Sequence, residues 1–282
     1  MKTKLIGNRK RRLEELMKEA IEDPKINEII EGKESKPIKT KNDTEEVLIF
    51  SNRDIIQAID KKGLLTVLVR PYLIKDFSMF KGRLYDCGNR SIKGTLDGKT
   101  LVDGVFDVIC EYGNTLYGGG NGFVHSVFVS SSNKGGYQVT ALYVHNNKLL
   151  YADSQGFVYD AFSSSKIGGC GKGPINALCS IGPILYYAYE NKIHEIYAND
   201  AELKTRPSKV NAMCIHNGRL IDGGDYGIFD TITGNALYVN YNPKVDAMIS
   251  IPADLFQDEF LSKIKEKADM ESGGFRSGLG GP

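Results

Sequence analysis

The sequence feature that most constrains the fold is a short repeat. An aliphatic residue, a short polar residue, Ala and then Leu or Met open four segments of the chain, which begin at Val139, Ile175, Val210 and Val245. Weaker copies begin at Ile74 and Phe106, so that successive copies start 32, 33, 36, 35 and 35 residues apart. Self-similarity at a nearly constant period of this size is typical of repeat architectures, in which each repeat is one supersecondary unit.

Each repeat predicts four short β-strands. In the copy that begins at Val210, apolar runs at 210–215, 219–223, 228–231 and 236–240 are separated by His-Asn-Gly, Tyr-Gly and Thr-Gly turns. Such turns between short apolar runs indicate β-hairpins. Four antiparallel strands repeated around an axis are the plan of a β-propeller, and the 31 glycines of this 282-residue chain suit many tight turns.

The two ends of the repeat region predict six blades. The last copy supplies only a first strand before Pro252, whereas residues 46–69 resemble second, third and fourth strands without a first. Joining the two ends completes one blade and closes the ring, which removes exposed sheet edges. We therefore expect an all-β fold, a six-bladed β-propeller over residues 46–251.

The segment 220–234 carries a resemblance to known repeats. Its second strand, its Asp-X-Gly turn and its Asp-x-x-Thr-Gly pattern resemble quinoprotein-type and WD-type propeller repeats, at the level of architecture and over residues 47–251. The chain departs from both types because it contains no Trp, which forms the WD dipeptide in one type and stacks on the quinone cofactor in the other. The resemblance implies a propeller that serves as a binding platform, without a specific chemistry.

A polar position recurs at the start of each predicted inner strand. The second residue of the six copies is, in chain order, Lys75, Asp107, Thr140, Asn176, Asn211 and Asp246. If the blades align, these side chains form one ring at a mouth of the central channel, and we predict a binding site there. Their oxygen atoms suit a hard cation such as calcium. The ring is similar to the metal site of six-bladed lactonase-type hydrolases, which implies Asp107, Asn176, Asn211 and Asp246 as ligands.

Two observations weigh against a metal in this ring. Lys75 would repel a cation and is placed to pair with Asp107. In addition, Asp, Asn and Thr often cap turns through hydrogen bonds from the side chain to the backbone. Turn capping at the entry to each inner strand is therefore the alternative explanation of the ring.

The two ends of the chain predict helical arms. Residues 1–45 predict a helix near residues 9–22 and a polar linker, and residues 252–282 predict an amphipathic helix near 253–270 and a flexible Gly-rich tail. Arg9, Lys10, Arg11 and Arg12 oppose the dipole of the N-terminal helix, so a contact with nucleic-acid phosphate or with an acidic protein surface is one explanation of them. A solvated charge run at a terminus is the other explanation, and the lack of interleaved aromatic residues favours it.

Composition narrows the functional class. The 36 basic and 35 acidic residues give no overall attraction to nucleic acid or membrane, and no apolar run is long enough to span a bilayer. Five cysteines without metal-like spacing indicate reduced thiols in the cytoplasm. Cys110, Cys179 and Cys214 share the fifth position of their copies and are predicted to be small core residues.

The sequence shows no Ser/His/Asp or Cys/His pattern, and a propeller alone does not define an activity. We therefore expect a non-catalytic cytoplasmic platform that binds a protein or another macromolecule through one propeller face, helped by the arms and without a cofactor. The alternative is a metal-dependent hydrolase of the lactonase type that uses the ring. Nucleic-acid binding through the basic arm is a third hypothesis.

Overall fold

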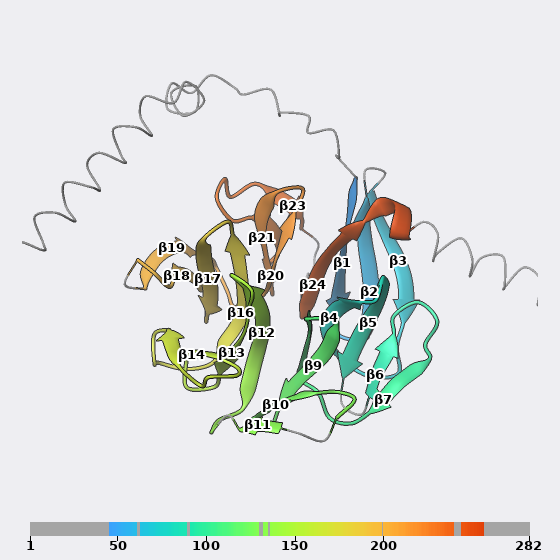
Figure 1. The fold of residues 1–282 in the computed structure, drawn as a ribbon. Coiled ribbons are helices and arrows are strands. Elements are labelled where there is room, and N and C mark those ends of the chain that lie inside the picture. The colour runs from blue at the N-terminus through green and yellow to red at the C-terminus, as the bar shows by residue number, and fades with distance from the viewer. Residues whose placement is uncertain are drawn as a thin grey trace, which may run out of the picture. The chain divides into compact units, whose positions relative to one another are not determined.

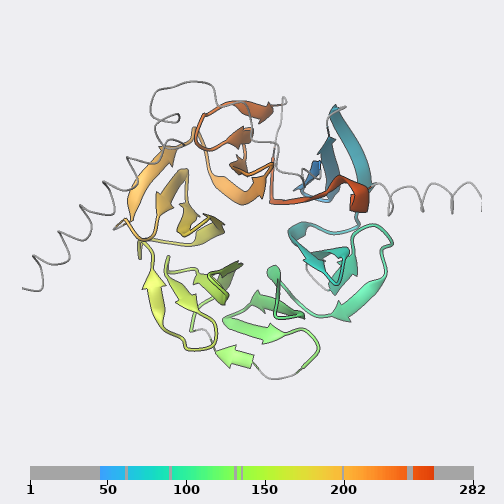
Figure 2. The same ribbon diagram turned by 45° about the horizontal axis from the view of Figure 1, so that its top comes forward.

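A computed structural model describes residues 45–60, 63–88, 91–129, 132–134, 136–198, 200–239 and 244–256. The chain divides into two units, Met1–Asp43 and Thr44–Pro282, and every described residue belongs to the second. This unit contains six four-stranded antiparallel sheets arranged around a central axis (Figures 1 and 2). The prediction of an all-β, six-bladed propeller is confirmed.

The sheets follow the repeat, and each runs from an inner to an outer strand. The inner strands are β4 (Ile74–Phe80), β8 (Val108–Tyr112), β12 (Val139–His145), β16 (Ile175–Ile181), β20 (Val210–His216) and β24 (Ala247–Pro252). The second strands are β5 (Arg83–Gly88), β9 (Thr115–Gly120), β13 (Lys148–Asp153), β17 (Ile184–Tyr189), β21 (Arg219–Gly224) and β1 (Glu46–Asn52). The third strands are β6 (Ser91–Gly94), β10 (Phe123–Ser126), β14 (Val158–Asp160), β18 (Lys192–Glu195), β22 (Gly227–Asp230) and β2 (Ile55–Asp60). The outer strands are β7 (Thr100–Asp103), β11 (Ser132–Lys134), β15 (Lys166–Gly168), β19 (Ala201–Thr205), β23 (Ala236–Tyr238) and β3 (Gly63–Val69).

One sheet is built from both ends of the described chain. Its strand order is β24-β1-β2-β3, and β24 pairs antiparallel with β1 from Glu46 opposite Pro252 to Ser51 opposite Ala247. Residues 253–256 continue as a short helical turn, whose Phe256 is buried against this sheet and the β4–β7 sheet. The rest of the predicted arms, including Arg9, Lys10, Arg11 and Arg12, lies outside the described residues.

The core lies in the seams between neighbouring sheets. Each of six hydrophobic clusters among the described residues combines side chains from two adjacent sheets. Small residues on the second strands permit this packing: a Cβ atom at Gly119 would lie only 2.7 Å from a Val139 methyl group of the next sheet. Apolar burial at the seams is the main force that holds such radial repeats together. No helix of the described part is long and apolar enough to cross a membrane.

Candidate functional site

The backbone of the inner strands explains how the polar ring forms. In β4, β12, β16 and β20 the pairing with the second strand slips at the second residue, which leaves Lys75, Thr140, Asn176 and Asn211 in β-bulges. Asp107 and Asp246 come immediately before β8 and β24. A bulge changes the direction of the side chain that it carries. The four residues in bulges therefore do not follow the alternation of their strands.

The six ring residues line one cavity of about 340 Å³ inside the central channel, together with deeper residues of the same inner strands. All six predicted positions therefore lie at one place in the fold: Lys75, Asp107, Thr140, Asn176, Asn211 and Asp246. Whether they bind a ligand stays a prediction.

The two Asn side chains of the ring connect neighbouring sheets. Asn176 Nδ2 donates a hydrogen bond to the Val210 carbonyl oxygen at 3.1 Å, and Asn211 Nδ2 donates to the Val245 carbonyl oxygen at 3.0 Å. These are hydrogen bonds from a side chain to the backbone, as turn capping requires, but they reach the first residue of the next repeat copy. The amides thus fasten one blade to the next.

The two carboxylates of the ring are also engaged. Asp107 pairs with the Lys75 ammonium group and accepts a hydrogen bond from Gln138 Nε2 at 3.2 Å. Asp246 accepts a hydrogen bond from the Arg53 backbone N–H at 2.7 Å and pairs with Lys244 at 3.0 Å. Within the described ranges, no group of three or more His, Cys, Asp or Glu side chains is arranged to hold a metal. The calcium hypothesis for the ring stays a prediction.

A buried carboxyl group lies next to the ring. Asp76 stands at a position where the other copies carry Val or Ala, for example Ala141. It accepts hydrogen bonds from the backbone N–H groups of Phe77 and Ile109 at 2.8 and 2.9 Å. The Asp76 side chain keeps some contact with the channel, but protein atoms surround its carboxyl group, and this burial raises its pKa to about 7. The sequence signal for this buried carboxyl group was one acidic residue at a position where the other repeat copies carry small apolar residues.

The three cysteines at the fifth position line the same cavity. Burial raises the pKa of the Cys110 and Cys179 thiols to about 12 and that of Cys214 well above its ordinary value. All five cysteines are free thiols. The three channel thiols are therefore neutral and contribute packing, as predicted for small core residues.

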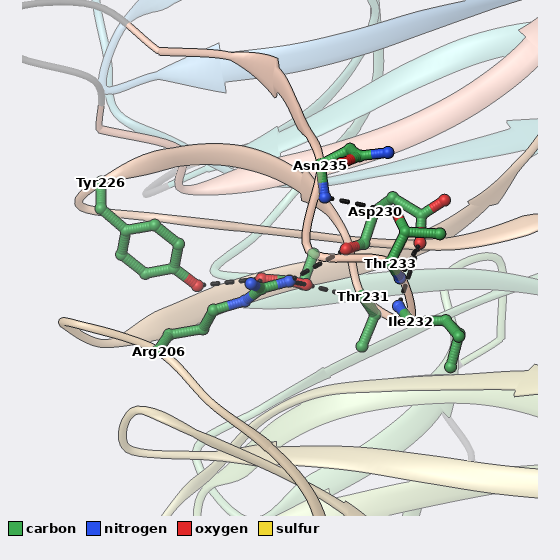
Figure 3. A network of polar contacts seen from close by, with 8 residues as sticks. Arg206, Tyr226, Asp230, Thr231, Ile232, Thr233 and Asn235 are labelled. Carbon is green, nitrogen blue, oxygen red and sulfur yellow. Dashed lines mark hydrogen bonds and ion pairs between the residues drawn. The ribbon is translucent and has the colours of Figure 1, made fainter.

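Two buried ion pairs were not predicted. Arg206, which follows β19, donates to both carboxylate oxygens of Asp222 on β21 (Figure 3). Tyr226 and Thr231 also donate to Asp222, at 2.9 and 2.8 Å. An equivalent pair joins Arg70 to Asp86 at 2.9 Å in the β4–β7 sheet. In both cases Arg and Asp are 16 residues apart, which was the available sequence signal.

The propeller face opposite the ring has a different character. In an antiparallel sheet, the inner and third strands run in the same direction, so the turns that follow them lie on one face, which we call the turn face. Four residues of this face share one position, two residues after the end of a third strand. They are between 51% and 57% exposed and form what we call the apolar arc: Phe128, Phe162, Tyr197 and Ile232.

Three residues of the apolar arc pack against aromatic rings of the preceding sheet. The ring centroids of Phe128 and Phe80 are 5.6 Å apart, and those of Tyr197 and His145 are 5.9 Å apart. Phe162 contacts Tyr112 at 5.6 Å. Each of these three contacts crosses from one sheet to the next, and the four residues of the apolar arc stand on four adjacent blades.

Two blades of the apolar arc carry the same cation-carboxylate arrangement. Asp160 accepts hydrogen bonds from the Phe162 and Ser163 N–H groups, and its second oxygen lies 3.5 Å from Lys148 Nζ. Two blades further on, Asp230 accepts hydrogen bonds from the Ile232 and Thr233 N–H groups, and its second oxygen lies 3.6 Å from Arg219. The lysine and arginine side chains are 59% and 69% exposed, whereas the two Asp side chains are 10% and 4% exposed. The surface around the apolar arc therefore presents cations.

The blade next to the apolar arc buries the corresponding apolar position. In the β4–β7 sheet the corresponding residue, Leu96, is buried. The short helix 253–256 begins at the end of β24, and its Phe256 packs with Phe77 and Leu84 of that sheet. The exposed apolar positions thus begin at the β8–β11 sheet, next to the sheet against which Phe256 packs.

Comparisons with known proteins agree with the fold. No family model and no curated protein matches the chain. Among solved structures it is similar to the WD40 β-propeller domain of Doa1, with a TM-score of 0.51 and 14% identity over 72% of this chain and 82% of that one. It is also similar to the extracellular domain of the putative one-component system BT4673 from B. thetaiotaomicron, with a TM-score of 0.50 and 11% identity over 72% of this chain and 36% of that one.

At these identities the likeness shows the fold alone. Together with the six four-stranded sheets and the repeat, it defines the class: the chain is a β-propeller repeat protein with WD-like repeats and no specific family.

Proposed function

We propose that the protein is a non-catalytic platform that binds a protein partner on its turn face. The observation that carries this proposal is the apolar arc, in which four adjacent blades expose an apolar side chain at the same position. Exposed apolar surface commonly marks an interaction site when it recurs on one face of a protein, and aromatic residues are enriched at the centres of protein interfaces.

The apolar arc is also held in place before any partner arrives. Asp160 and Asp230 fix the backbone of the turns that carry Phe162 and Ile232, and the Tyr112 ring packs against Phe162. A preformed surface loses little conformational freedom on binding, so more of the contact energy remains available for affinity. This rigidity supports a platform in which the partner adapts to the propeller.

The polar groups of the channel favour a structural role over catalysis. Asn176 and Asn211 bond to backbone carbonyls, and Asp107 and Asp246 each have a basic partner. The alternative function, a metal-dependent hydrolase of the lactonase type, would use these four ring residues as metal ligands. The cytoplasmic location and the nucleic-acid hypothesis for the basic arm also stay predictions.

A crosslinking experiment tests the platform. A photoreactive amino acid is placed at Phe162 or Tyr197 in the full chain, expressed in its native cells, and the control places it at Tyr137, which is 54% exposed before β12 on the opposite face. We expect a discrete protein adduct from the two positions of the apolar arc and none from Tyr137. No adduct, or equal adducts from both faces, would contradict the proposal.

A further inference from the structure

The chemistry of the turn face narrows the partner, on the assumption that the proposed platform function holds. We infer that the apolar arc binds an acidic amphipathic helix of another protein, which lies across the β12–β15, β16–β19 and β20–β23 sheets. Phe162, Tyr197 and Ile232 would receive its apolar face, and Lys148 and Arg219 would receive its acidic residues.

The first step of the argument concerns backbone hydrogen bonds. The turn N–H groups of Phe162, Ser163, Ile232 and Thr233 are already bound to the carboxylates of Asp160 and Asp230. An extended peptide needs free backbone groups on the surface to which it adds, as in strand addition to a sheet edge. A helix satisfies its own backbone and requires only an apolar surface. The turn face therefore fits a helix better than a strand.

The second step concerns charge. In the Lys148–Asp160 and Arg219–Asp230 pairs the carboxylate is buried and the cation reaches into solvent, so an approaching partner meets positive charge. Lys204 adds to it, because a Cβ atom at Gly234 in the Ile232 turn would lie 3.4 Å from its ammonium nitrogen. Complementary charge at the rim of an interface increases the association rate and selects the partner.

The third step concerns how charge and apolar surface are distributed. In the β16–β19 sheet, between the two cation-bearing sheets, Ile184 takes the strand position of Lys148 and Arg219, and the half-buried Glu195 takes that of Asp160 and Asp230. Tyr197 is exposed next to this site. The two exposed cations therefore stand on the first and third of the three sheets, with Ile184 and Tyr197 on the sheet between them. This spacing matches a helix that carries acidic residues near both of its ends, beside an apolar stripe.

Two synthetic helical peptides test this inference. Both carry the same Leu and Phe stripe at helical spacing, and the flanking positions are all Glu in one peptide and all Lys in the other. Fluorescence anisotropy with the full chain measures their dissociation constants. We expect the acidic peptide to bind at least tenfold more tightly, with an affinity that falls as salt is added.

Variants locate the binding site of the peptides. The double substitution Lys148→Glu plus Arg219→Glu should reverse the preference, and Ile232→Ser should weaken both peptides by a similar factor. Lys209→Glu, a charge reversal at an exposed lysine before β20 on the ring face, is the control and should change neither affinity. Equal affinity for the two peptides, or tighter binding of the basic one, would overturn the inference.

If the apolar arc binds something other than an acidic helix, crosslinking and sedimentation give different results. Crosslinks from Phe162 to residues 1–44 or 257–282 of the same chain, or self-association in sedimentation that Ile232→Ser abolishes, would also overturn it. The proposed function fails separately, when Phe162 and Tyr197 give no more protein adduct than Tyr137. Adducts from the apolar arc without any peptide discrimination would leave the platform standing and reject the acidic helix.

Discussion

Arg206 and Asp222 form a two-point ion pair inside the β20–β23 sheet: Arg206 Nε lies 2.8 Å from Asp222 Oδ1, and Nη2 lies 2.5 Å from Oδ2. Both side chains are almost completely buried. The Arg206 guanidinium group also donates to the carbonyl oxygen of Asp230, so one arginine links the segment between two blades to two strands of the next blade. The Arg70–Asp86 pair does the same in the β4–β7 sheet, where Arg70 donates to Asp86 and to the carbonyl oxygens of Gly94 and Thr95.

The substitution Asp222→Ala should reduce the free energy of unfolding by about 3–5 kcal/mol, because it leaves the Arg206 charge buried without a partner. Urea unfolding followed by circular dichroism measures this loss. The matched control is Asp225→Ala in the exposed turn that follows β21, which should cost no more than about 1 kcal/mol. Equal losses for the two variants would contradict a structural role of the buried pair.

The sequence predicted those features that recur in every repeat. The copies that begin at Ile74, Phe106, Val139, Ile175, Val210 and Val245 predicted the sheets and placed the ring on one cavity, because one period fixes equivalent positions in space. The buried pair escaped prediction, since an Arg between strands looks like a solvated linker residue. The apolar arc escaped as well, because exposure of Phe162 or Ile232 depends on the turn conformation and on neighbours from another blade. The predicted helix near residues 9–22, and the predicted C-terminal helix beyond residue 256, lie outside the described residues.

The Asp76 carboxyl group should make stability depend on pH. Its pKa of about 7 in the folded protein exceeds its ordinary value of 3.8, so the folded state binds more protons between these values. The free energy of unfolding should therefore be highest below about pH 4 with respect to this group, and should decrease as the pH rises to 7. One pKa unit corresponds to about 1.4 kcal/mol, which sets an upper limit of about 4 kcal/mol, reduced by solvent in the channel.

The variant Asp76→Ala isolates this contribution, because other repeats carry Ala at this position. Chemical unfolding at several pH values should show a flatter dependence in the variant than in the wild type between pH 4 and 7. Burial lowers the pKa of His145 and His216, which gives a dependence of the opposite sign, and the difference between the two proteins cancels it. Asp254→Ala, at an exposed carboxylate, is the control. Parallel pH curves for wild type and Asp76→Ala would contradict the prediction.

The ring amides should contribute to the seams between blades. Asn211→Ala removes the hydrogen bonds from Nδ2 to the Val245 carbonyl oxygen and to Asp225, so we expect a loss of about 1 kcal/mol in the free energy of unfolding. The buried Thr140 hydroxyl has no hydrogen-bond partner among the described residues. Thr140→Val keeps the shape of the side chain and should leave stability unchanged or slightly higher. A larger loss for Thr140→Val than for Asn211→Ala would show that the ring does not act through these bonds.

The metal hypothesis predicts that a divalent cation stabilises the folded protein, whereas the ion pairs of the ring predict that it does not. Lys75 and Lys244 neutralise the carboxylates of Asp107 and Asp246, and a divalent cation would have to displace them against their repulsion. Millimolar calcium, magnesium, manganese or zinc should therefore leave the thermal midpoint of the wild type unchanged. A ligand of the folded state present at 100 times its dissociation constant would add about 2.7 kcal/mol, which a melting curve detects readily. If one metal raises the midpoint of the wild type but not that of Asp107→Ala plus Asp246→Ala, the ring is a metal site. That result would favour the hydrolase hypothesis, against which the ion pairs of the ring now argue.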